Sequence, residues 1–163
     1  MPATINQNND AGLCSAVIIF TATATDNCGP VTIAYSKNPG TVFPVGTTIV
    51  TFTATDASGN TSNCSFKVIV TPDQLVGSVS VKTYVGGYNV TCKGSRNGEA
   101  TVTAIGGCLP YTYSWNSLPV QTSAVGSGLG AGNNNVVVTD ANGTSISFNV
   151  NITEPSQLVN NVG

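Results

Sequence analysis

One turn motif occurs twice in the chain and constrains its fold more than any other feature. A run of β-branched and apolar residues enters the turn Asp56–Asn60, and a second such run, Cys64–Val70, follows it. The same arrangement returns at Asp140–Gly143, followed by Ile146–Ile152. Asp, Asn and Gly between two strand-forming runs are typical of a β-hairpin. Two such hairpins, each followed by a proline, predict two modules built to one plan.

The composition favours sheet and excludes several partners. Thr, Val, Ser and Asn are abundant, and β-branched side chains pack well on a pleated surface. The five basic residues stand singly, whereas nucleic-acid binding needs clustered Lys or Arg, so we expect no nucleic-acid partner. No apolar run is long enough to predict membrane insertion. A signal peptide is expected to be absent or already removed.

The cysteines favour disulfides over zinc. Zinc sites use Cys-x-x-Cys spacing, often with histidine, and the chain has neither that spacing nor a histidine. Disulfides form in a non-reducing compartment, so the chain is expected to be secreted. The count is odd, so at least one thiol is free or pairs outside this chain. The five are Cys14, Cys28, Cys64, Cys92 and Cys108.

The first module has three predicted strands between its lead-in and its hairpin turn, and it resembles a known family. Strands are predicted over Cys14–Ala24, Val31–Tyr35 and Thr47–Ala54, after a lead-in or edge strand in residues 1–13. The motifs of residues 1–72 resemble the hyalin repeat (HYR) in order and spacing. They are Asp26-Asn27-Cys28, Pro39-Gly40, Phe43-Pro44-Val45-Gly46-Thr47-Thr48, Thr53-Ala54-Thr55-Asp56-Ala57-Ser58-Gly59-Asn60 and Cys64-Ser65-Phe66. This resemblance implies an immunoglobulin-like sandwich in an extracellular protein that serves adhesion.

The second module, residues 73–163, resembles a different repeat. Its motifs between about residues 75 and 158 are similar to those of the SprB repeat, which occurs in very large surface adhesins of gliding Bacteroidota. We predict strands over Val76–Val81, Tyr84–Tyr88, Glu99–Ile105, Val136–Val138 and Ile146–Ile152, with a long loop over 116–135. The motifs are Cys92-Lys93-Gly94, Asn97-Gly98, Gly106-Gly107, Pro110-Tyr111-Thr112-Tyr113-Ser114-Trp115, Thr139-Asp140-Ala141-Asn142-Gly143 and Ile152-Thr153-Glu154-Pro155.

A short repeat marks the module boundary. Pro72-Asp73-Gln74-Leu75-Val76 is matched by Pro155-Ser156-Gln157-Leu158-Val159. A further repeat is therefore expected to begin at about residue 156, and we interpret the chain as part of a longer array.

Polar residues of two loops form a candidate calcium site. In the immunoglobulin-like topology that the resemblance implies, both loops lie at one pole of the first module. Their oxygens would supply part of the six to eight ligands of calcium. Asp side chains that accept hydrogen bonds from their own turns explain the same residues without an ion, and we favour that interpretation. A glycosidase pair of carboxylates is the third alternative, and nothing else in the sequence builds a cleft for it. The residues are Asp26, Asn27, Asp56, Ser58 and Asn60.

The disulfide pairing predicted for the first module depends on the same topology. Cys28 and Cys64 are expected near that pole, which favours a Cys28–Cys64 bond with Cys14 unpaired. A Cys14–Cys64 bond is the alternative. The SprB repeat often has a cysteine where Thr144 stands here, and its absence leaves Cys92–Cys108 as the expected bond of the second module.

Aromatic residues raise the question of sugar binding. Tyr111, Tyr113 and Trp115 share one face of a strand, and such a row is more often core than a stacking platform. Tyr84 and Tyr88, beside two glycines, are the ligand-binding candidates that remain.

These features predict two tandem immunoglobulin-like β-sandwiches without enzymatic activity. We expect a rigid spacer or filament segment of a secreted, multi-domain bacterial adhesin at the cell surface. Its partners would be neighbouring repeat modules of the same or identical chains, and surface polysaccharide. No cofactor is expected besides the candidate calcium. The alternative is a carbohydrate-binding or accessory module of a secreted polysaccharide-degrading enzyme.

Overall fold

The computed structural model describes residues 3–157, and that range consists of strands and their connections. It forms two compact units, Met1–Asp73 and Gln74–Gly163, each with its own hydrophobic core. The predicted all-β fold is confirmed. Within this range no helix could span a membrane. Leu158 and Val159, which belong to the predicted further repeat, lie outside the described residues.

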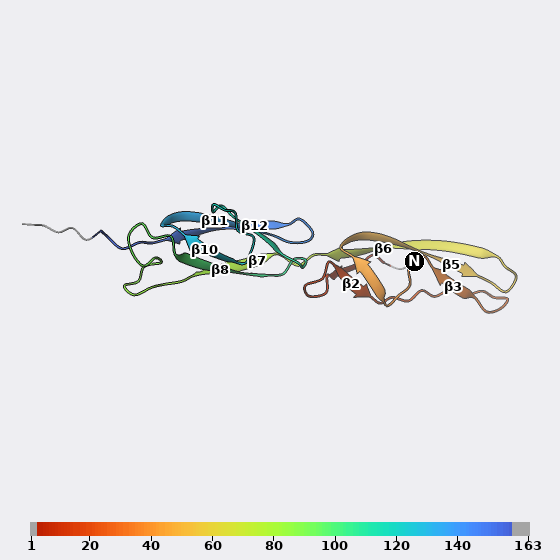
Figure 1. The fold of residues 1–163 in the computed structure, drawn as a ribbon. Helices are drawn as coiled ribbons and strands as arrows, with labels where there is room; N and C mark the ends of the chain where they lie inside the picture. Colours follow the sequence, from red (N-terminus) through yellow and green to blue (C-terminus); the bar gives the residue numbers. More distant parts are fainter. Residues whose placement is uncertain (1–2, 158–163) are drawn as a thin grey trace, which may run out of the picture. The chain divides into compact units, whose positions relative to one another are not determined.

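The first unit is a sandwich of two sheets (Figure 1). The larger sheet has the order β1-β6-β5-β3, in which β1 runs parallel to β6 and the other pairs are antiparallel. The smaller sheet is the antiparallel pair of β2 and β4. The strands are β1 Ile5–Asn8, β2 Ser15–Ile18, β3 Thr32–Tyr35, β4 Thr41–Pro44, β5 Gly46–Thr55 and β6 Thr61–Thr71.

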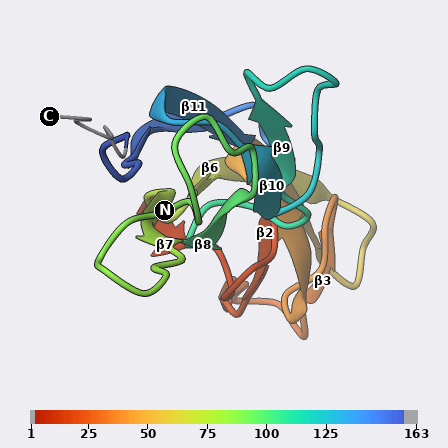
Figure 2. The same cartoon turned by 60° about the vertical axis from the view of Figure 1, so that its left-hand side comes forward.

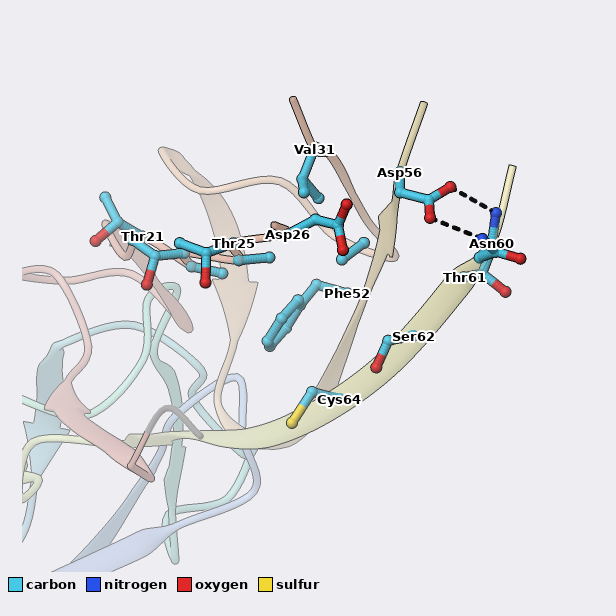
Figure 3. Close-up of a pocket in the computed structure, with 14 residues that line it drawn as sticks. Thr21, Thr25, Asp26, Val31, Phe52, Asp56, Asn60, Thr61, Ser62 and Cys64 are labelled. Atoms are coloured by element: carbon cyan, nitrogen blue, oxygen red, sulfur yellow. Dashed lines mark hydrogen bonds between the residues drawn. The ribbon is translucent and has the colours of Figure 1, made fainter. Parts of the chain in front are cut away.

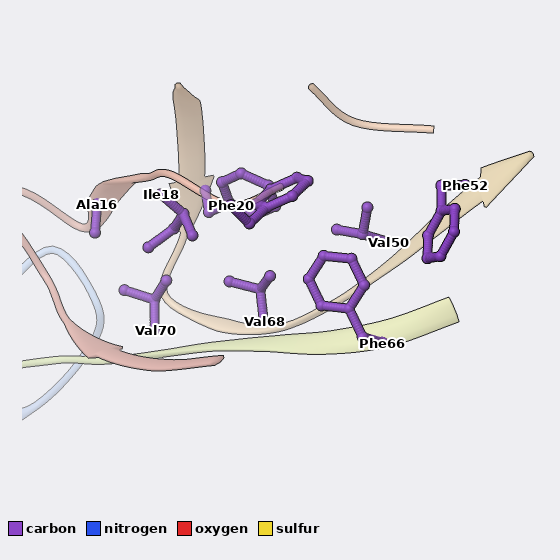
Figure 4. Close-up of a cluster of buried hydrophobic side chains, with 9 residues drawn as sticks. Ala16, Ile18, Phe20, Val50, Phe52, Phe66, Val68 and Val70 are labelled. Atoms are coloured by element: carbon purple, nitrogen blue, oxygen red, sulfur yellow. The ribbon is translucent and has the colours of Figure 1, made fainter. Parts of the chain in front are cut away.

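Side chains from both sheets fill the core of this unit (Figure 4). Alternate residues of β6 point inward, because successive side chains of a strand face opposite sides of the sheet. Val68 is fully buried, whereas its neighbour Lys67 is exposed. Phe20, just after β2, places its ring 5.0 Å from the Phe66 ring in a T-shaped arrangement. Such aromatic pairs add about 0.5–1.5 kcal/mol to the stability gained from burial alone.

The second unit is also a two-layered sandwich, which Figures 1 and 2 show from two sides. One sheet has the order β10-β8-β7 and the other the order β12-β11-β9, with antiparallel pairing throughout. The strands are β7 Val76–Val81, β8 Gly98–Ile105, β9 Thr112–Trp115, β10 Val125–Leu129, β11 Gly132–Thr139 and β12 Ser145–Ile152.

Trp115 is the largest side chain of the second core. It is 1% exposed, and its indole N–H donates a hydrogen bond to the Ser123 carbonyl at 3.0 Å. Gly126 of β10 lies against the ring, so closely that a Cβ atom there would stand 2.7 Å from ring carbons. Tyr111 and Tyr113 are half-buried beside the same core. The prediction that this aromatic row is core is therefore confirmed.

Two strand predictions and one loop prediction are wrong. The predicted strand Cys14–Ala24 is limited to Ser15–Ile18, because β4 pairs with no residue beyond Ile18. Tyr84–Tyr88 is a turn, closed by the bond from the Tyr84 N–H to the Tyr88 carbonyl at 2.7 Å. The predicted loop 116–135 contains β10 and the start of β11. There Gly126 makes room for the Trp115 ring.

Candidate functional site

The Asp56 hairpin is built by the carboxylate of its own first residue. Asp56 Oδ1 accepts the backbone N–H groups of Ser58 at 2.9 Å and Asn60 at 2.8 Å, and Oδ2 accepts the Asn60 side-chain amide at 2.8 Å. These bonds, first of all that from the Asn60 side chain, lower the pKa of Asp56 because they favour the charged form. Gly59 supplies the positive φ of +87° that the turn needs.

Asp26 makes a similar turn in the neighbouring loop. Its Oδ2 accepts the Cys28 backbone N–H at 2.9 Å, which forms an Asx turn. The candidate calcium ligands therefore have hydrogen-bonding roles without an ion. The described residues also contain no group of three or more His, Cys, Asp or Glu that could hold a metal.

The two loops border a pocket of about 640 Å³ between the layers of the first unit (Figure 3). Asp26, Asp56 and Asn60 line it, so the structure brings three of the five predicted residues together. Asn27 and Ser58 are not among the lining residues. The sequence predicted the loops but not the pocket between them.

Small inner residues explain why this end of the sandwich is hollow. Segment Thr21–Asp26 forms one wall, Ser62 and Cys64 of β6 face it, and the Phe52 ring lies between the two walls. Ala54 of β5 also lines the pocket. Further along β6, the same face carries buried Phe66 and Val68, which fill the core. Side chains as small as Ala and Ser cannot close the gap between two sheets, which pack about 10 Å apart. The Thr-Ala-Thr-Ala-Thr run was the sequence signal for this cavity.

The predicted disulfides are wrong. Cys28, Cys64 and Cys92 are free thiols, which rules out the Cys28–Cys64, Cys14–Cys64 and Cys92–Cys108 bonds in this structure. Cys28 is exposed at the tip of its loop, whereas Cys64 faces the pocket, so lying near one pole does not bring their sulfur atoms together. Cys14 and Cys108 each take part in a disulfide.

In the second unit, Asp140 repeats the turn of Asp56 and adds a contact. Its Oδ1 accepts the N–H groups of Asn142 at 2.9 Å and Thr144 at 2.8 Å, as in the first hairpin. Its Oδ2 accepts the Cys108 N–H at 3.1 Å, which ties the hairpin to another loop. Asp140 is 5% exposed. The second copy of the motif is therefore a structural centre of its sandwich.

Tyr84 and Tyr88 lie in a glycine-rich turn. The Tyr84 hydroxyl donates to the Asn97 carbonyl at 2.9 Å, and the Lys82 ammonium lies 5.4 Å from the centre of the Tyr84 ring. Both tyrosines are half-buried. These contacts position Tyr84 within its own unit, and ligand binding at the two tyrosines stays a prediction.

Comparison with known proteins identifies both modules. The family model of the HYR domain matches residues 1–70, and the model of the SprB repeat matches residues 88–119. The chain carries a HYR domain followed by an SprB repeat. The SprB match covers a shorter part of the second unit than the resemblance in the sequence suggested.

The curated relatives are similar to less than half of the chain. The chain is 35% identical over 71 residues to hyalin of Lytechinus variegatus and 40% identical over 78 residues to hyalin of Strongylocentrotus purpuratus. These matches cover 42% of this chain but only 13% and 6% of the two hyalins. Together with the disulfide, they indicate an extracellular adhesive repeat module.

Among solved structures, the chain is similar to protocadherin ectodomains. Extracellular cadherin domains 1–5 of protocadherin gamma B2 align at 14% identity and a TM-score of 0.38, covering 94% of this chain and 38% of that one. Domains 1–4 of protocadherin gamma B7 align at 13% identity and a TM-score of 0.35, covering 92% and 47%. The assignment of the fold rests on the strands and cores described above.

Proposed function

We propose that the chain is a structural and adhesive segment of a bacterial cell-surface adhesin, in which the two sandwiches act as a rigid spacer. The observation that supports this proposal is the direct succession of two different repeat modules, HYR and then SprB. Only residues 72–75 separate the last strand of one unit from the first strand of the next. Repeat arrays of this kind extend a distal binding region away from the cell.

The short connection is held by contacts within each unit. On the HYR side, the Asp73 N–H donates to Asn9 Oδ1 at 2.6 Å and the Asn8 side chain donates to Asp73 Oδ1 at 3.0 Å. On the SprB side, Leu75 is 3% exposed, and a Cβ atom on Gly106 would stand 2.1 Å from the Gln74 carbonyl oxygen. A connection anchored at both ends favours a stiff spacer over a flexible tether.

The proposal includes no catalytic activity. The two carboxylates that line the pocket, Asp26 and Asp56, each accept hydrogen bonds from their own turns. Its partners would be neighbouring repeat modules and surface polysaccharide. The accessory-module alternative required an exposed aromatic platform, and the burial of Trp115 removes the best candidate for one.

Spin labels on two native thiols test the spacer. Cys28 and Cys92 are exposed and free, one in each unit, and Cys64→Ser removes the third thiol. We expect double electron–electron resonance to give a narrow distribution of the distance between the two labels. Insertion of a six-residue Gly-Ser segment between Asp73 and Gln74 should broaden it. A native distribution as broad as that of the insertion variant would refute the rigid spacer.

Antibody labelling of intact source cells tests the surface location.

A further inference from the structure

The segment Thr21–Thr25 has the pattern of a strand but pairs with no strand. It runs without turn or bend, with exposed threonines alternating with half-buried Ala22 and Ala24. Its one backbone hydrogen bond among the described residues joins the Ala22 N–H to the Tyr35 hydroxyl at 3.0 Å. Backbone N–H and C=O groups are strong hydrogen-bonding groups, so the remaining ones in this segment are available to a partner.

The pocket beside this segment has room for the partner. Its volume of about 640 Å³ lies within the range of ligand sites, roughly 300–1,000 Å³. Figure 3 shows Thr21 and Thr25 across the gap from Ser62 and Cys64, with the Phe52 ring between the two walls. Ala22, Ala24 and Ala54 make part of the lining apolar. A strand laid along Thr21–Thr25 could therefore place alternate side chains into the pocket.

The charge of the pocket indicates what the partner carries. Asp26 and Asp56 line it at the hairpin end, and no Lys or Arg is among the lining residues. Asp56 is held ionised by its turn, since its pKa is lowered. Two uncompensated carboxylates at one end favour a ligand with a positive charge there.

We propose that Thr21–Thr25 is the acceptor edge for a β-strand donated by a protein of different sequence. The donated strand would pair with the free backbone groups, place small or β-branched side chains into the pocket, and carry Lys or Arg beside Asp26 and Asp56. This is recognition by strand addition, in which main-chain hydrogen bonds give affinity and alternate side chains give specificity. The proposal goes beyond the spacer function, because it gives the HYR domain a peptide-binding site.

Nuclear magnetic resonance with a designed peptide tests the site. The probe is a peptide of alternating Thr and Val with one Lys at each end, added to the full, isotope-labelled chain. We expect amide signals of residues 21–25 to shift, and exchange of alternate amide hydrogens there to slow at least tenfold. A matched peptide with every amide nitrogen methylated should do neither, because neither of its edges then has an N–H donor for the carbonyls of residues 21–25.

Two charge variants test the recognition of the cation. Asp26→Asn keeps an oxygen for the Cys28 N–H but removes a charge, so the Lys peptide should bind three- to tenfold more weakly. Asp73→Asn makes the same change in the same unit outside the pocket and should leave binding unchanged. A peptide with Gln in place of Lys should bind Asp26→Asn and Asp73→Asn equally well.

Four results would overturn the proposal. One is the absence of amide protection at millimolar peptide, and another is equal binding of the methylated peptide. The third is protection of the same amides by raised protein concentration alone, because the occupant would then be a second copy of the chain. A neutral oligosaccharide that shifts pocket signals without protecting amides would likewise replace the peptide as the ligand.

Discussion

The double role of Asp140 leads to a quantitative prediction for the substitution Asp140→Asn. Asparagine has the same shape, so one side-chain oxygen can still accept the Asn142 and Thr144 N–H groups. The other position becomes an amide nitrogen that faces the Cys108 N–H, where Asp140 Oδ2 accepted it at 3.1 Å. Two donors then face each other, and Cys108 is 0% exposed, so water cannot replace the lost acceptor.

The expected loss of stability follows from these contacts. A buried donor without a partner costs about 1–3 kcal/mol, and exchanging two charge-assisted bonds for neutral ones costs about 1 kcal/mol more. We therefore expect Asp140→Asn to lower the free energy of unfolding of the second unit by about 2–4 kcal/mol. With a typical slope of about 1–3 kcal/mol per molar urea, the midpoint should fall by at least roughly 0.7 M.

The chain contains its own probe for this measurement. Trp115 is the single tryptophan and lies in the core of the second unit, so urea-dependent tryptophan fluorescence follows that unit. Asp56→Asn, the matched change in the first hairpin, should leave this transition in place. A loss below about 0.5 kcal/mol for Asp140→Asn would show that the Cys108 contact is unimportant for stability.

Three further predictions concern packing and titration. Gly126→Ala should destabilise the second unit by about 1–3 kcal/mol in the same fluorescence assay, because the new Cβ would overlap the Trp115 ring. Burial, followed by the charges of nearby groups, raises the pKa of Tyr111 above its ordinary value of 10.0. Stability of the second unit should therefore be intact below about pH 10 and fall as the pH rises further, and Tyr111→Phe should flatten this fall in alkaline urea titrations. The pKa of Asp56 is lowered from 3.8, so its contribution to the first unit should be present above about pH 4 and lost as the pH falls further. Calorimetry of Asp56→Asn in acid should show a weaker pH dependence of that unit.

The sequence predicted best those elements whose pattern is local. The last strand was expected at Ile146–Ile152 from strict alternation, and the structure has Ser145–Ile152 with Val150 and Ile152 buried. Both hairpins were predicted because Asp, Asn and Gly encode a turn within a few residues. The alternation of apolar and polar residues along a strand, and the residue types of a turn, each depend on one element. They can therefore be recognised in the sequence without knowledge of the neighbouring elements.

Features that depend on distant contacts could not be predicted. Strand β10 was missed because Gly126 and Gly128 suggested a loop, whereas Gly126 makes room for the Trp115 ring from another strand. The disulfide pairing failed for a similar reason, because lying near one pole does not bring two sulfur atoms within bonding distance. The pocket was missed because small residues form a cavity only when the facing layer is also small.

The two copies of the hairpin motif have the same hydrogen bonds within the turn but different structural roles, and burial accounts for the difference. Asp56 and Asp140 each accept the backbone N–H groups of the residues two and four positions later in the turn. At Asp56 the second oxygen binds the Asn60 side chain of the same turn, and that hairpin borders an open pocket. At Asp140 the second oxygen binds another loop, and the carboxylate is buried. The motif thus specifies the turn, and the surrounding packing decides whether its aspartate faces a binding site or closes a core.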